Sequence, residues 1–131
     1  RTIRDLGERL AAHEAAALVE RGRPVGSARV VVEVLDGWDQ QGLKAMASAA
    51  AARPGVVAAL VSAAAPALVV IARAPDVALD AAAVLKTLQQ AFGGKGGGKP
   101  ELAQGGGLSG PSGQLRAALE QAIEAALRPG A

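Results

Sequence analysis

The stretch from Gly93 to Gly113 reads GGKGGGKPELAQGGGLSGPSG and contains ten of the seventeen glycines of this 131-residue chain. Helical patterns flank the stretch on both sides, and it encloses a specific sequence, KPELAQ, at residues 99–104. A flexible linker is the simplest interpretation of so much glycine. We favour an ordered functional loop, because glycine lets another molecule approach the backbone closely and functional residues concentrate in loops on rigid scaffolds.

The preceding part of the chain alternates between helical and extended patterns. Runs rich in apolar and β-branched residues predict three strands, at residues 29–35, 56–62 and 68–73. Apolar residues at helical spacing predict three helices, whose N-caps are Asp39 or Asp36, Asp76 or Asp80, and Ser109 or Ser112. The first two strands flank a helix, so we expect them to be parallel, and the third strand to be antiparallel to the second. The sequence therefore predicts an α/β fold, in which helices cover a small mixed β-sheet.

An N-terminal helix is expected to precede this sheet as a coiled-coil-like arm over residues 1–24, with the globular domain at residues 25–131. Its apolar seam extends over about two heptads and consists of Ile3, Leu6, Leu10, His13 and Ala17. Such a one-sided helix needs a cover, which could be this domain, an upstream part of the chain or a second copy. An oligomerisation module that forms a homodimer is therefore an alternative function. Because the chain begins at Arg1, we also expect upstream domains in a longer polypeptide.

The composition restricts the classes of function. The chain has no cysteine, which excludes disulfides and thiolate metal sites, and its net charge of +2 permits a nucleic-acid partner without requiring one. No signal peptide is recognisable, and we expect a cytoplasmic protein. Residues 54–72 carry no charge, but Pro66 and the β-branched residues on either side of it predict two buried strands instead of a membrane-spanning helix.

No catalytic constellation is recognisable in the sequence. Residues 93–100 fit a P-loop pattern, except that Pro100 replaces the Ser or Thr that would bind magnesium, and the segment follows a helix instead of a strand. Residues 105–110 formally match the dinucleotide-binding pattern, but no strand is predicted before them. The single histidine, His13, has no metal-ligand partner at suitable spacing, and the serines have no base in motif context. We therefore expect no catalytic residue, no metal site and no cofactor in this chain.

Nucleic-acid binding is the chemical function that these residues support. Lys95 and Lys99 lie on a loop with free N–H groups, an arrangement that suits a sugar–phosphate backbone. Lys86 and Arg116 on the flanking helices could extend this positive surface. Two aromatic residues are too few for a stacking platform, so recognition is expected to depend on RNA shape and backbone. Trp38 is a candidate stacking group or, equally, a core residue.

Residues 92–107, FGGKGGGKPELAQGGG, resemble the signature of the C-terminal domain of alanyl-tRNA synthetase, a domain that is also associated with DHH phosphoesterases. The resemblance extends loosely over residues 1–128, which combine a helical arm, a βαββα body and a final helix. It makes the motif residues candidates for nucleic-acid binding, namely Gly93, Gly94, Lys95, Gly96, Gly97, Gly98, Lys99, Gln104, Gly105, Gly106 and Gly107.

The resemblance also implies a function. The parent enzyme uses ATP to join alanine to its tRNA at sites upstream of this domain, and the C-terminal domain binds tRNA and can mediate dimerisation. The implied partners are alanine tRNA and the upstream domains of the same chain. In the related phosphoesterases the domain is a substrate-binding part beside a DHH domain, and its motif contains Gly-Gly-His. Here Lys95 follows Gly93 and Gly94, and the DHH motif is absent, which favours the synthetase branch.

Overall fold

A computed structural model describes residues 13–26, 28–63 and 67–127 of the chain. Six strands form one sheet in the order β1-β2-β3-β4-β6-β5. The strands are β1 (Arg23–Val25), β2 (Ala28–Leu35), β3 (Val56–Ser62), β4 (Ala67–Arg73), β5 (Lys95–Lys99) and β6 (Leu102–Leu108). The helices are α2 (Gln40–Ala51), α3 (Ala81–Phe92) and α4 (Ser112–Leu127), together with a helix at residues 13–20.

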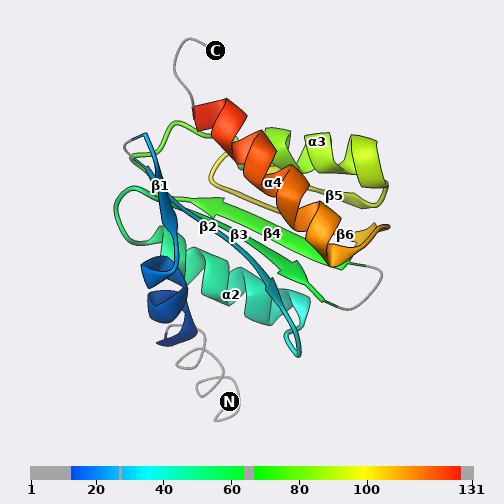
Figure 1. Cartoon of the computed structure of the whole chain (residues 1–131), viewed down its shortest axis with the longest axis horizontal. Coiled ribbons are helices and arrows are strands. Elements are labelled where there is room, and N and C mark those ends of the chain that lie inside the picture. Colours follow the sequence, from blue (N-terminus) through cyan, green and yellow to red (C-terminus); the bar gives the residue numbers. More distant parts are fainter. Residues whose placement is uncertain (1–12, 27, 64–66, 128–131) are drawn as a thin grey trace.

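The α/β fold predicted from the sequence is confirmed. β2 pairs with β3 in parallel, as expected for two strands that are joined through α2, and β4 is antiparallel to β3. The other neighbouring strands are antiparallel, so the sheet is mixed. Figure 1 shows α3 and α4 on one side of the sheet and α2 on the other.

Two apolar cores lie on the two faces of the sheet. Alternate residues of β2 divide between them, since Val30 and Val32 face α3 and α4, whereas Val31 faces α2. β3 is buried along its whole length, as expected for a central strand that is covered on both faces. β4 is also buried except at Leu68 and Arg73, so both strands in the charge-free run are core strands. In the part of the chain that the structure describes, no helix is long and apolar enough to cross a membrane.

α2 and α3 begin at N-caps that the sequence predicts, whereas α4 begins with Ser112 inside the helix, so neither Ser109 nor Ser112 is its N-cap. The Asp39 carboxylate accepts a hydrogen bond from the Gly42 N–H at 2.8 Å and caps α2, and the Asp80 carboxylate caps α3. One apolar face of α2 and one of α3 are buried, and Phe92 at the end of α3 is partly buried. The buried face of α4 consists of Leu115, Leu119 and Ile123, whereas Ala126 is exposed.

The described end of the N-terminal helix packs on the sheet. Ala15 and Leu18 are buried in the core on the α2 side, whereas His13 is exposed and Ala17 is only partly buried. The buried face of this segment therefore differs from the predicted seam. The other predicted seam residues lie outside the described part of the chain, namely Ile3, Leu6 and Leu10.

Arg29 on β2 fixes the end of this helix. Its Nε donates a hydrogen bond to the Val19 carbonyl, and its Nη2 donates one to the Glu20 carbonyl at 2.7 Å. The last carbonyls of a helix have no partner within the helix, and a cation is favourable at that end. Arg29 therefore caps the helix and joins it to the sheet.

The prediction of a loop over residues 93–113 is wrong, because most of this stretch forms a hairpin of β5 and β6. β6 pairs with β4, and β5 forms the outer edge of the sheet. Glycine is depleted in strands, since it has no side chain to pack, and the stretch therefore carries no strand signal. β1 was also not predicted, because its three residues include Pro24 and resemble a helix stop.

Candidate nucleic-acid interface

The register of the β5–β6 hairpin determines where the candidate residues lie. Residues that are directly opposite each other in antiparallel strands share a face of the sheet. The pairs on one face are Lys95 with Gly106, Gly97 with Gln104, and Lys99 with Leu102. The pairs on the other face are Gly96 with Gly105 and Gly98 with Ala103.

One face of the hairpin is covered by α3, which contacts both β5 and β6. Ala103 and Gly105 are buried on this face, and a Cβ added to Gly105 would lie 3.2 Å from Cδ1 of Leu85 on α3. The opposite face lies on the α2 side of the sheet, because Leu102 packs against the core that includes α2. There α2 packs on β3 and β4, and the lysines of β5 are exposed.

We refer to this second surface as the open face, and it consists of Lys95, Gly97, Lys99, Leu102, Gln104 and Gly106. Lys95 and Lys99 are four residues apart on one strand, which places their Cα atoms about 13 Å apart. Neither lysine forms an ion pair within the described residues. Both ammonium groups are therefore available to an anionic partner.

Three glycines of the hairpin are required by packing. A Cβ added to Gly94, Gly96 or Gly98 would lie within 2.5 Å of a backbone oxygen of β6. Side-chain carbons do not approach backbone atoms that closely, so the two strands would have to separate. Gly97 differs, because a Cβ there would meet nothing within 4 Å and its backbone conformation is open to any residue. The fold therefore explains alternate glycines of β5 but leaves Gly97 unexplained.

Backbone hydrogen bonds hold both ends of the hairpin on the domain. The Ala81 N–H donates to the carbonyl of Pro100 in the turn between β5 and β6, at 2.8 Å. At the other end, the Ser109 N–H donates to the Phe92 carbonyl at the end of α3, at 2.9 Å. The open face is therefore part of a fixed sheet edge and not a mobile insertion between two helices.

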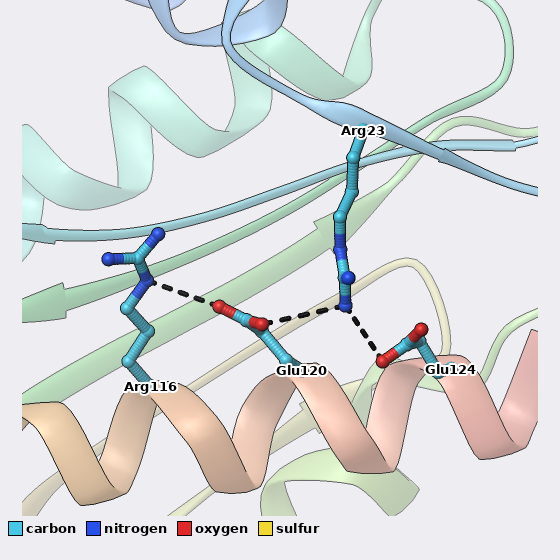
Figure 2. A network of polar contacts seen from close by, with 4 residues as sticks. All are labelled: Arg23, Arg116, Glu120 and Glu124. Carbon is cyan, nitrogen blue, oxygen red and sulfur yellow. Dashed lines mark ion pairs between the residues drawn. The ribbon is translucent and has the colours of Figure 1, made fainter.

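The positive surface does not extend to Arg116. The Arg116 guanidinium on α4 pairs with Glu120 at 3.2 Å, and Glu120 lies 3.5 Å from Arg23 of β1, as Figure 2 shows. Arg23 also pairs with Glu124 at 2.7 Å. Since β1 and β5 are opposite edges of the sheet, this network lies far from the open face. The ion pairs of this network join β1 to α4.

The remaining candidates have separate positions. Lys86 is exposed on α3, which packs on the covered face of the hairpin, so it could reach a ligand of Lys95 only around the sheet edge. Trp38 is partly buried against the core, and a Cβ added to Gly42 would lie 2.6 Å from its ring, which indicates a packing role. The described residues contain no group of three or more His, Cys, Asp or Glu that could hold a metal ion.

Known proteins resemble this chain in sequence. Residues 27–128 match the DHHA1 domain. The alanine–tRNA ligase of Thermosynechococcus vestitus is 37% identical over 128 residues, which cover 93% of this chain and 14% of the ligase. That of Myxococcus xanthus is 35% identical over 112 residues, which cover 82% of this chain and 12% of the ligase. The chain therefore spans a small part of the length of these relatives.

Solved structures share the fold. The C-Ala domain of alanyl-tRNA synthetase from Aquifex aeolicus matches 81% of this chain and 96% of its own length, with a TM-score of 0.70 and 22% identity. RecJ from Thermus thermophilus matches 92% of this chain and 17% of its own length, with a TM-score of 0.65 and 16% identity. Together with the match over residues 27–128, these findings show that the chain belongs to the DHHA1 domain family.

Proposed function

We propose that this chain is the C-terminal tRNA-binding domain of an alanine–tRNA ligase and has no catalytic site of its own. The similar alanine–tRNA ligases align with up to 93% of the chain, while most of each ligase lies outside the alignment. In this proposal the upstream domains carry out alanylation and editing in the cytoplasm, and residues 1–24 lead to them, with Ala15 and Leu18 packed on this domain.

The open face is the observation that carries this proposal. It presents two exposed lysines on a fixed sheet edge, with the small residue Gly97 between them. Lysine binds phosphate as a point charge, and phosphate contacts supply affinity and orientation without base identity. A face with this composition suits the sugar–phosphate backbone of a folded RNA.

Association of two copies through the β5 edge is disfavoured by its sequence. KGGGK reads the same in both directions, so antiparallel pairing of two β5 strands around Gly97 would place Lys95 opposite the second copy's Lys99. Like charges directly opposite each other are destabilising, and lysine on an edge strand opposes edge-to-edge pairing. The edge is better suited to a polyanion than to a second copy. A homodimer through residues 1–24 stays a prediction.

A salt titration of tRNA binding tests the proposal. We expect the chain to bind alanine tRNA at low salt, with the logarithm of the affinity falling linearly with the logarithm of the salt concentration. Replacing Lys95 and Lys99 together by alanine should weaken binding and reduce the slope by about 1.4 to 1.8, since each phosphate contact contributes about 0.7 to 0.9.

A charge-matched variant separates local contact from a general effect of charge. Arg21→Ala combined with Arg116→Ala also removes two positive charges, but both residues belong to the β1 side of the domain. We expect this variant to retain most of the affinity and the wild-type slope. Absence of tRNA binding by the wild-type chain at low salt would refute the proposed function, and equal losses in the two double variants would refute the assignment of the open face.

A further inference from the structure

The geometry points to Gln104, which lies beside Gly97 and Gly106, as a specificity-determining residue. Its side chain forms hydrogen bonds with the base edge of one ribonucleotide. The phosphates on either side of that ribonucleotide contact Lys95 and Lys99. This inference rests on the proposed tRNA-binding function. It assigns two roles within the open face, with affinity from the lysines and discrimination from the amide.

Gln104 has a central position on the open face. It lies two residues from Leu102 and from Gly106 along β6, and directly opposite Gly97 on β5. On its other side it pairs with Val70 of β4, which is buried under α2. Gln104 is therefore partly exposed at the inner side of the face, and it is the one uncharged polar side chain among the six residues that form it.

Space is left free on the Gly97 side of Gln104. A Cβ added to Gly97 would meet nothing within 4 Å, and one added to Gly106 would meet only Cδ2 of Leu68, at 3.0 Å. Neither glycine has a positive φ, so the backbone does not require glycine at these positions. On the Gly106 side the side chain of Leu68 occupies the space, so the open approach to Gln104 lies over Gly97. A ligand that approaches over Gly97 meets no side chain at that position.

The chemistry of the amide differs from that of the lysines. A carboxamide supplies two N–H donors and one acceptor, and within the described residues its side chain has no hydrogen-bond partner. An ammonium group only donates and does not distinguish one phosphate from another. Bidentate amide contacts to a base edge do carry sequence information, and exposed bases of folded RNA offer such edges.

The positions of the three side chains fit one strand of RNA. Lys95 and Lys99 lie two residues on either side of Gly97, which is the cross-strand partner of Gln104. The amide therefore lies opposite the midpoint of the line between the lysines. A sugar–phosphate strand that follows β5 would place phosphates at both ends and the nucleotide between them over the amide.

Two variants test the inference with two RNA probes, alanine tRNA and single-stranded poly-uridine. Gln104→Ala should weaken binding of the tRNA by about fivefold to a hundredfold, the loss typical of a base contact, with the salt slope unchanged. Binding of poly-uridine should change less than twofold. Gly97→Val should fold, because the added Cβ meets no atom within 4 Å, and should also weaken tRNA binding by covering the approach to Gln104.

The outcomes separate this inference from the proposed function. If Gln104→Ala and Gly97→Val keep wild-type affinity for tRNA while the Lys95 and Lys99 double variant loses it, the role of Gln104 is refuted and the proposed function stands. A lower salt slope in Gln104→Ala would also refute the division of roles. If the wild-type chain binds neither RNA, both proposals fail. Thermal unfolding of each variant confirms that a loss of binding is not a loss of fold.

Discussion

Two single substitutions at adjacent glycines of β5, Gly98→Ala and Gly97→Ala, should change the free energy of unfolding in opposite directions. A Cβ at Gly98 would lie within 2.5 Å of the Leu102 carbonyl oxygen and of Cα of Ala103, where 3.0 Å is the closest approach that side-chain carbons make. The strands must therefore separate by about 0.5 Å or more, and overpacking of this kind costs about 1 to 3 kcal/mol. β5 is an edge strand that can move outwards, which keeps the cost of Gly98→Ala within this range.

Gly97→Ala should instead stabilise the chain slightly. The new methyl group meets nothing within 4 Å, so the main effect is the lower conformational entropy of the unfolded chain. That effect contributes about 0.4 to 1 kcal/mol where the native backbone conformation suits alanine.

Thermal unfolding followed by circular dichroism measures both changes. With an unfolding entropy of about 2.1 cal/mol/K per residue over 131 residues, 1 kcal/mol corresponds to about 4 °C in Tm. We expect Tm to fall by about 4 to 11 °C for Gly98→Ala and to rise by about 1 to 4 °C for Gly97→Ala. Equal destabilisation by the two substitutions would refute the assignment of Gly97 to the open side of the strand.

Three further predictions concern contacts away from the open face. Asp80→Ala removes the N-cap of α3 and should lower the free energy of unfolding by about 0.5 to 2 kcal/mol in urea titrations. Arg29→Ala removes two hydrogen bonds to carbonyls and should destabilise the chain by about 1.5 to 3 kcal/mol, with the largest rise in hydrogen exchange at residues 13–20. The pair of Arg23 and Glu124 is half-exposed, so a double-mutant cycle should give a coupling energy below about 1 kcal/mol.

The apolar part of the fold could be predicted from the sequence because its side chains carry a periodic signal. Residues 56–61 and 68–72 are continuous apolar runs, and the helices after Asp39 and Asp80 have one apolar face each. Burial of these apolar side chains also stabilises the elements in the structure. The periodic pattern in the sequence therefore reflects the same interaction that holds the fold together. The parallel pairing of β2 and β3 followed from the helix between them.

The glycine-rich hairpin could not be predicted in this way. β5 consists of three glycines between two exposed lysines, and it has no apolar side chain that could indicate a strand. What makes it a strand is its close backbone pairing with β6, which is a tertiary contact. The motif identified the residues of the candidate interface, but their division between two faces depends on a register that the sequence does not encode locally. For the same reason Arg116 was grouped with the lysines, although it lies at the opposite edge of the sheet.

The glycines of the open face also affect the entropy of binding. A side chain that becomes fixed at an interface loses rotamer freedom, which costs about 0.5 to 1.5 kcal/mol for each flexible residue. Gly97 and Gly106 have no rotamers to lose and Leu102 is partly buried, so the cost on the protein side falls mainly on Lys95, Lys99 and Gln104. A surface built mainly from hydrogen-bonded backbone is in this sense preorganised, because it has the same shape before and after its partner binds.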